Sequence, residues 1–499
     1  MEGFDRRELL ARGAALGATA LVPGWAEKAF AAPSRSPLAE LSRLVDGPVL
    51  TRKSAAYARA RLLFSPRFDG VHPQAVVQVV SVRDVQRTVL WARRHGVRLA
   101  TRSGGHSFAG YSTGPGVVLD VSRLRKISVD AKGRATIGAG ARLIDVDAAL
   151  WRHRRAIPAG SCPTVGIAGL ALGGGTGYSS RKLGLTCDSV LGLTIVTADG
   201  KALAADPKHH PDLYWASRGG GGGNFGVATS FVFRTYPVGK VTTFLLEWPW
   251  TQARAIVQAW QSLGPHAPDE LFSTLNLTAF DPGVATRLRV TVKGQFFGTP
   301  AQLKNALGPL ISSGTPSRVR IQEKTFMDAA FEFAGCADVD RCRREPQGKV
   351  SRQAWSAKSD YANRLLTTAA IRTMATALEA RVADPKLGAG AILLDAYGGA
   401  IGRVPKAATA FVHRDALFSI AYFAYFRGGG NVAANVAWTR KLHAAMRPYV
   451  SGLAYQNYVD PDLGDWAHAY YGTNYARLRK VKRRYDPRNV FRFAQSIRP

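Results

Sequence analysis

Two residues of this sequence, His106 and Cys162, lie in glycine-rich segments that could surround a phosphorylated cofactor. The first segment spans residues 101–110, and the second runs from residue 160 to residue 177. Glycine has no Cβ atom, so backbone N–H groups in such segments can approach a pyrophosphate closely. A nucleophilic imidazole and a thiol beside that pyrophosphate could each bond to a flavin ring, which would make the protein a flavin oxidase. Each residue alone has a simpler explanation, because a histidine can be a turn residue and a cysteine a buried apolar side chain.

The two segments together resemble a known family. Residues 102–106 read Arg-Ser-Gly-Gly-His, and residues 162–166 read Cys-Pro-Thr-Val-Gly. They look like the two flavin-attachment motifs of the berberine bridge enzyme-like FAD-linked oxidases, in the vanillyl-alcohol oxidase superfamily, of the bicovalent bacterial type. The resemblance covers residues from about 70 to 240 and from about 390 to 499. It implies an FAD bonded to His106 through the 8α-methyl group and to Cys162 through ring carbon 6.

A third glycine-rich segment, residues 218–226, contains a Gly-x-Gly-x-x-Gly string. A dinucleotide fingerprint needs a strand before it and a helix after it, whereas here residues 212–216 look helical and residues 227–235 look like a strand. The segment instead resembles the part of the family that packs beside the flavin pyrophosphate; a turn without a ligand is the alternative. Besides His106 and Cys162, the resemblance implies FAD contacts from Arg102, Ser103, Gly104, Gly105, Ser107, Val165, Gly166, Gly169, Gly173, Gly174, Gly175, Gly177, Gly223, Asn224, Gly226, Val227, Tyr458 and Asn474.

Tyr458 is the candidate catalytic base. In family members that oxidise alcohols or sugars, the tyrosine of the corresponding Asn-Tyr motif is implied to remove the substrate hydroxyl proton. A free phenol, with a pKa of about 10, is a poor base near neutral pH unless a neighbour assists it. Asp395 resembles the acidic partner in sugar-oxidising members, so we expect Asp395→Asn to move the pH profile to higher pH. The alternatives are a turn cap for Asp395 and core packing for Tyr458; Tyr397 and Tyr455 are further candidates for the pocket wall.

An alternation of strands and helices up to about residue 238 must position the first two segments. The helix beginning at Ser81 and Asp84 has a suitable opening turn, and Gly96 is its natural end. Alternating or 3.6-residue apolar spacing predicts strands at residues 73–82, 97–101, 117–121 and 129–140, and helices at residues 33–65, 81–96 and 143–153.

The pattern changes after residue 240. Apolar residues alternate with Arg287, Arg289 and Lys293, which predicts an antiparallel sheet with one side in water. Residues 418–426 are almost entirely apolar, so that strand is predicted to be covered on both faces. Further helices are predicted at residues 301–310, 361–382 and 435–447.

The fold class that follows is α+β. The resemblance implies a two-lobed FAD-binding domain of the PCMH type and a substrate domain, an antiparallel sheet backed by helices, that roofs the flavin ring. We expect a signal peptide at residues 1–31 and an N-terminal lead-in at residues 32–70. The FAD-binding domain is expected at residues 71–240 and the substrate domain at residues 241–450. Residues 451–499 are expected to return to the FAD-binding domain.

The N-terminus predicts export. Arg6 and Arg7 precede an apolar run over residues 13–22, and residues 29–31 suit a signal peptidase. The paired arginines favour the twin-arginine machinery, with a general secretory signal as the alternative. No other run of apolar residues is long enough to span a bilayer, so we expect no transmembrane span in the mature chain.

The four cysteines fit an exported flavoprotein. Cys336 and Cys342 lie in one polar segment, and their spacing predicts a small-loop disulfide. A metal site is not expected, because no histidine pair accompanies them. Cys187 is predicted to be a buried structural thiol, which leaves Cys162 for the cofactor.

The net charge of +32 has a bearing on partners. The positive residues are spread along the chain and no nucleic-acid motif is present, so we expect no specific nucleic-acid partner, but an anionic envelope or substrate. The leading interpretation is an exported oxidase that takes a hydride from a C–H bond beside a hydroxyl or amine of a carbohydrate or other small molecule, and passes electrons to O2, giving H2O2. The alternatives are a dehydrogenase with another acceptor and a non-catalytic protein that binds the anionic envelope.

Overall fold

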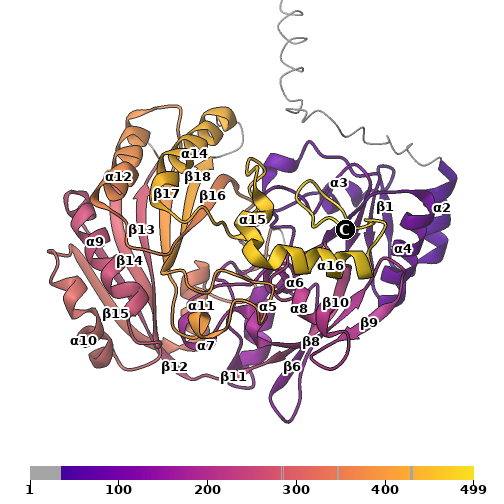
Figure 1. Cartoon of the computed structure of the whole chain (residues 1–499), viewed down its shortest axis with the longest axis horizontal. Coiled ribbons are helices and arrows are strands. Elements are labelled where there is room, and N and C mark those ends of the chain that lie inside the picture. Colours follow the sequence, from indigo (N-terminus) through magenta and orange to yellow (C-terminus); the bar gives the residue numbers. More distant parts are fainter. Residues whose placement is uncertain (1–34, 282–283, 285, 346–347, 427–430) are drawn as a thin grey trace, which may run out of the picture.

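The computed structural model describes residues 35–499, except residues 282–283, 285, 346–347 and 427–430. It contains two regions that lie side by side (Figure 1). The C-terminal helices lie on the first region, although the whole second region separates them from it in the sequence (Figure 1). Within the described residues, no helix is both long and apolar enough to cross a membrane. The signal peptide predicted for residues 1–31 lies outside the described residues.

The first region contains two main sheets. One has the strand order β1-β2-β4-β3, in which β2, β4 and β3 are parallel, and the other has the antiparallel order β5-β6-β10-β8-β9. Its strands are β1 (Val49–Thr51), β2 (Ala75–Gln78), β3 (Leu99–Arg102), β4 (Val117–Asp120), β5 (Ile127–Val129), β6 (Arg134–Gly138), β7 (Arg155–Ala156), β8 (Val190–Val196), β9 (Ala202–Ala205), β10 (Val227–Arg234) and β11 (Tyr236–Pro237). Its helices are α2 (Arg35–Leu44), α3 (Tyr57–Ala60), α4 (Val82–His95), α5 (Leu143–Trp151), α6 (Ile167–Leu172), α7 (Ser180–Leu183) and α8 (Pro211–Ala216), joined by α15 (Trp466–Tyr471) and α16 (Tyr475–Tyr485) of the tail.

The second region is one antiparallel sheet of seven strands, in the order β15-β12-β14-β13-β17-β18-β16. The strands are β12 (Lys240–Trp248), β13 (Leu271–Ala279), β14 (Leu288–Phe296), β15 (Arg318–Thr325), β16 (Ala354–Ala362), β17 (Gly390–Ala396) and β18 (Phe418–Phe426). The helices are α9 (Ala253–Leu263), α10 (Pro300–Ile311), α11 (Phe326–Ala334), α12 (Thr368–Ala383), α13 (Ala400–Arg403) and α14 (Val432–Met446).

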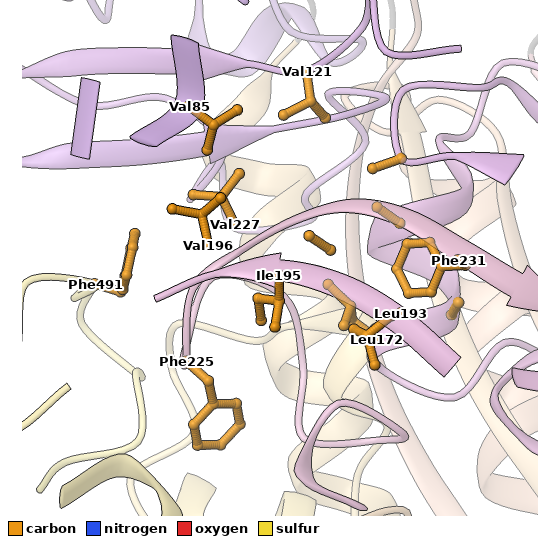
Figure 2. Close-up of a cluster of buried hydrophobic side chains, with 14 of the residues drawn as sticks. Val85, Val121, Leu172, Leu193, Ile195, Val196, Phe225, Val227, Phe231 and Phe491 are labelled. Carbon is orange, nitrogen blue, oxygen red and sulfur yellow. The ribbon is translucent and has the colours of Figure 1, made fainter. Parts of the chain in front are cut away.

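Each region has its own apolar core. In the first core, side chains from distant segments converge, among them Val85, Val196, Val227 and Phe491 of the tail (Figure 2). In the second core, α9, α10, α12 and α14 pack on one face of the sheet (Figure 1). Burial of these apolar surfaces is the main favourable contribution to folding, and the tail belongs to the first core because Phe491 and its neighbours are buried there.

Local signals in the sequence account for several helix ends. The Ser81 hydroxyl accepts a hydrogen bond from the Asp84 amide at 3.1 Å, which caps the first turn of α4. The same helix ends at Gly96, whose φ of +64° is in the left-handed region. This helix is confirmed as predicted, and β3 then leads directly into the segment that carries His106.

Three predicted elements differ from the structure. Residues 33–65 are not one helix, because β1 separates α2 from α3 and pairs with β2 as the edge strand of the sheet. Residues 129–140 form a hairpin, since Asp130 accepts hydrogen bonds from the amides of Lys132 and Arg134 and so reverses the chain. The helix predicted from residue 361 begins at residue 368, because residues 361 and 362 are still paired within the sheet.

The second face of the large sheet also differs from the prediction. Its central polar side chains are not in water: Thr274 and Gln295 are only 4% and 2% exposed. They are buried because this face packs against the first region, where the Gln295 amide donates to the Ser179 hydroxyl at 3.3 Å. The polar residues of this sheet therefore lie at the contact between the two regions. Strand β18 is covered on both faces, as predicted.

The cysteines follow the prediction. Cys336 and Cys342 form a disulfide with Cα atoms 5.4 Å apart, and Cys187 is a buried free thiol. Cys162 is free and its side chain is exposed.

Candidate functional site

The two glycine-rich segments that carry His106 and Cys162 are in direct contact. A Cβ atom on Gly104 would lie 2.2 Å from the backbone nitrogen of Gly166, and one on Gly166 would lie 2.1 Å from the Ser103 hydroxyl oxygen. Both distances are far inside van der Waals contact, so only glycine allows this approach. The segments, which are remote in the sequence, therefore form one wall of a shared cavity.

This cavity has a volume of about 270 Å³. None of the backbone N–H groups of residues 104–107 donates to a protein acceptor in the described part of the chain. Amides grouped in this way can bind the oxygens of a pyrophosphate. The predicted FAD contacts that line the cavity are Arg102, Ser103, Gly104, Gly105, His106, Ser107, Val165, Gly166, Gly169, Gly223, Asn224, Gly226, Val227 and Tyr458.

Sequence reasoning missed the aromatic residues of the cavity. Phe108 stacks on Tyr458 with ring centroids 4.7 Å apart, at the end where His106 lies. Tyr111 and Phe493 also line the cavity and have ring centroids 4.9 Å apart. Phe108 lies in the first glycine-rich segment and Tyr111 directly follows it, so their position in the sequence could have indicated a place in the cavity. Phe493 comes from the tail, and no sequence signal connects it with the cavity.

Two glycines test whether the cavity fits FAD. A Cβ atom on Gly169 would meet no atom within 4 Å, and one on Gly222 would meet only Leu172 at 3.8 Å. Both glycines line the cavity, so side chains there would project into it. The free amides suit the pyrophosphate, and the apolar and aromatic walls suit a planar ring system. The residues present therefore fit FAD.

Filling the cavity should exclude the cofactor. We expect Gly169→Leu to be purified with less than about a tenth of the wild-type FAD, because the new side chain would occupy cofactor space. Gly308→Leu is the matched control, since a Cβ there also meets nothing within 4 Å but the residue lies on α10, outside the cavity. The flavin-to-protein absorbance ratio measures the effect, and normal FAD content in Gly169→Leu would contradict this position for the cofactor.

His106 lies at one end of the cavity as a neutral imidazole. Its Nε2 atom is 2.9 Å from the Thr164 hydroxyl, and its ring stacks on Phe64 with centroids 4.1 Å apart. Burial lowers the pKa of His106 to about 3, with further lowering by the positive charges of Arg142 and Arg344. Nδ1 has no hydrogen-bond partner among the described residues. A neutral imidazole with one free nitrogen can act as a nucleophile.

Cys162 lies near the contact between the two glycine-rich segments. Burial raises the pKa of its thiol, and the positive charge of Lys293 acts in the opposite direction. Its side chain is nevertheless exposed. Ser161 and Pro163, on either side of it, line a small cavity of about 40 Å³ that Gln295 also lines. The loop of Cys162 therefore lies beside the sheet face that meets the first region.

Asp395 and Tyr458 are brought together from opposite regions. The Asp395 carboxylate accepts a hydrogen bond from the Thr274 hydroxyl at 2.7 Å, and burial raises the pKa of Asp395. The Tyr458 hydroxyl has no hydrogen-bond partner among the described residues, and its residue lines the larger cavity. Burial raises the pKa of Tyr458 well above 10, and the Asp395 charge raises it further.

This charge interaction corrects the predicted pH effect. We expected Asp395 to lower the pKa of Tyr458, so that its removal would move the pH profile to higher pH. A nearby negative charge instead disfavours the phenolate and raises its pKa. Asp395 is also not a turn cap, because it lies in β17 and bonds to the neighbouring strand.

Some predicted FAD contacts lie elsewhere. The amide of Asn474 donates to the carbonyls of residues 406 and 409, at 2.9 and 3.2 Å, and the residue does not line the cavity. Gly173 and Gly174 pack against Asn457 and Tyr455, and the Gly175 amide donates to the Tyr455 hydroxyl at 2.7 Å, whereas Gly177 lies against Ala159. The predicted FAD contacts that do not line the cavity are Cys162, Gly173, Gly174, Gly175, Gly177 and Asn474.

The other tyrosines predicted at the pocket are buried structural residues. Tyr397 is fully buried and its hydroxyl lies 3.2 Å from that of Tyr361. Tyr455 is 3% exposed. Arg414 forms a buried ion pair with Asp188.

Comparison with known proteins supports this assignment of the site. The family model described as "FAD binding domain" matches residues 73–206, and the model described as "Berberine and berberine like" matches residues 454–498. The first segment contains His106 and Cys162, and the second contains Tyr458.

Relatives cover nearly the whole chain. The uncharacterized FAD-linked oxidoreductase YgaK of Bacillus subtilis is 35% identical over 91% of this chain and 97% of its own length. The solved structure of Physcomitrella patens BBE-like 1 has a TM-score of 0.84 and 31% identity, over 92% of this chain and 98% of that one. Xylooligosaccharide oxidase from Myceliophthora thermophila C1, solved with xylobiose, has a TM-score of 0.82 and 27% identity, over 93% and 99%. The chain therefore belongs to the berberine bridge enzyme-like family of FAD-linked oxidoreductases.

Proposed function

We propose that the protein is an oxidase that removes a hydride from the carbon beside a hydroxyl group of a carbohydrate or related small molecule. The observation that carries the proposal is that Tyr458 lines the same cavity as His106 and that the charge of Asp395, from the other region, acts on its hydroxyl. A relative solved with xylobiose supports a carbohydrate as the substrate class. When bound, FAD supplies the acceptor for the hydride.

The cofactor is proposed to be bonded to the chain at two positions. His106 is oriented by Thr164 and Phe64, and its free Nδ1 atom is available to form a bond. Cys162 is unpaired and accessible. A single bond already prevents the ring from dissociating, and a second bond also removes rotation about the first. The matched residues thus support bicovalent attachment.

Tyr458 and Asp395 are proposed to handle the hydroxyl proton. Tyr458 is neutral at physiological pH because its pKa is raised. It can therefore accept the substrate proton only after its own hydroxyl has ionised, or while it passes its own proton to another group. Asp395, whose pKa is also raised, is a stronger base than an ordinary carboxylate. The pair can therefore share the proton that leaves the substrate hydroxyl as the hydride departs.

Oxygen is the proposed electron acceptor, with H2O2 as the product. The experiment is a peroxide-coupled screen of mono- and oligosaccharides and hydroxylated natural products. A protein that reduces an artificial dye but forms no peroxide with the same substrate would be a dehydrogenase. A protein purified without flavin would instead support the non-catalytic alternative.

Asp395→Asn should move the rising limb of the pH profile to lower pH. The Asp395 charge adds to burial in raising the pKa of Tyr458, so its removal lets the phenolate form at lower pH. Anaerobic stopped-flow measurement of flavin reduction across pH tests this. Asp395→Glu keeps the charge and should move the limb less. A shift to higher pH would contradict the electrostatic role of Asp395.

Export through the twin-arginine machinery is proposed from Arg6 and Arg7, and the mature chain is expected to begin near Ala32. Replacing both arginines by lysine should leave the precursor in the cytosol, because that machinery reads the pair itself and not only its charge. Fractionation and N-terminal sequencing measure the result. Unimpaired export of the double variant would indicate the general secretory route.

A further inference from the structure

We propose that Lys293 activates Cys162 for its bond to FAD by holding a positive charge beside the sulfur atom. The inference rests on the proposed bicovalent cofactor and concerns how the second bond is made. It assigns a role to a residue of the second region that contributes to the site only after the two regions have packed together.

The sheet register places Lys293 on the face that meets the first region. Lys293 on β14 is paired with Thr274 on β13, and Thr274 is paired with Asp395 on β17. Directly paired residues in adjacent strands point to the same side of a sheet. Lys293, Thr274 and Asp395 therefore form one row on that face.

The neighbour of Lys293 on the same face links this row to Cys162. Gln295, two residues along β14, points the same way as Lys293 because side chains alternate in a strand. Gln295 lines the small cavity that Ser161 and Pro163 also line. Since these two residues flank Cys162, Lys293 lies on the sheet face that the loop of Cys162 approaches, in the same row as Asp395.

The Lys293 ammonium is not held in an ion pair with any described residue. The acidic groups that act on it are Asp395 and Glu332, but Asp395 is bonded to Thr274 and Glu332 is paired with Arg320 and Lys324. Burial lowers the pKa of Lys293, and Asp395, Glu332 and Cys162 act against that lowering. The positive charge of Lys293 therefore acts on Asp395, Glu332 and Cys162 together.

The chemistry needs that charge, because the thiolate is the nucleophile and burial alone disfavours it. The Cys162 thiolate would form a bond to carbon 6 of the oxidised ring. The hydrogen on that carbon leaves as a proton, and the electron pair of the C–H bond remains on the ring, which is thereby reduced by two electrons. Molecular oxygen then reoxidises the ring and becomes H2O2.

Lys293→Met tests the inference by counting the bonds to FAD. Protein purified after a short expression is incubated in air at pH 7 or pH 9, and mass spectrometry of the flavin peptides gives the fraction attached to both His106 and Cys162. Each unit of thiol pKa changes the thiolate fraction at pH 7 about tenfold. We expect formation of the Cys162 bond to be at least about tenfold slower in Lys293→Met, with the His106 bond retained.

Two results separate an electrostatic role from a structural one. Lys293→Arg and incubation of Lys293→Met at pH 9 should both restore the Cys162 bond, because one returns the charge and the other forms the thiolate without it. Several other titratable groups face this space, namely Tyr178, Tyr425, Tyr458, Asp395 and Glu332. The pH effect is therefore read on the bond to Cys162 and not on activity.

Lys324→Met is the matched control. It removes another lysine near Glu332, on the edge strand β15, and should leave both bonds as in the wild type. Formation of the Cys162 bond at the wild-type rate in Lys293→Met would overturn the inference while leaving the proposed function intact. Loss of both bonds in Lys293→Met and Lys293→Arg would also overturn it, since Lys293 would then be structural. A wild-type protein without a Cys162 bond would reject the bicovalent cofactor itself.

Discussion

Replacing His106 and Cys162 together by alanine is expected to yield a protein that releases essentially all of its FAD on acid precipitation, whereas the wild type retains it. The cavity would still bind FAD through the amides of residues 104–107 in the native state. Acid unfolds that cavity, so only a covalent bond keeps the flavin with the precipitate. Absorbance of the supernatant and pellet measures the difference.

The single variants are the internal controls for this experiment. His106→Ala and Cys162→Ala should each retain FAD in acid, with the flavin mass on the one remaining peptide. Cys187→Ala removes the other free cysteine, which is buried, and should leave both bonds intact. Release of wild-type flavin by acid would show that neither bond exists.

Tyr458→Phe is expected to slow flavin reduction by about 10²–10⁴-fold, which corresponds to about 3–5 kcal/mol of activation free energy. The substitution keeps the ring that stacks on Phe108 and removes only the hydroxyl group that handles the proton. Anaerobic stopped-flow spectroscopy measures the rate, while FAD content and reoxidation by oxygen should change little.

Tyr111→Phe provides a matched control for that variant. Tyr111 also lines the cavity and its ring contacts another aromatic ring, that of Phe493, so Tyr111→Phe likewise removes one phenolic hydroxyl from an aromatic pair. Its rate of flavin reduction should stay near that of the wild type. A Tyr458→Phe rate within a factor of about three of the wild type is too small for a general base and would assign Tyr458 to the pocket wall.

The sequence predicted correctly those elements whose ends are marked by characteristic residue types. Helix α4 is confirmed because Ser81 and Gly96 determine its two ends. The disulfide of Cys336 and Cys342 is also confirmed, since so short a loop leaves these cysteines few other partners. The helix prediction is wrong for residues 361–367. Helix propensity is a local property and does not reveal that Tyr361 pairs with a neighbouring strand.

The large sheet shows where sequence patterns stop being informative. The alternation around Lys293 predicted the strand, yet it also predicted that the polar face would be in water. Alternation reveals that two faces differ, and it does not reveal what covers them. Here the first region covers the polar face, as the bond from Gln295 to Ser179 demonstrates.

What the sequence by itself determined is the chemical inventory of the site: the glycine-rich segments, His106, Cys162 and Tyr458. The lack of a Cβ atom at Gly104 and Gly166 follows from residue type alone, whereas the contact that requires it exists only in the folded chain. Only the tertiary structure decided the environment of those groups. The pKa of Tyr458 is raised by burial and by Asp395 from another strand, and the charge of Lys293 acts on Cys162 across the contact between the regions. Desolvation and charge interactions depend on distance in space, so they are determined only when the two regions pack together.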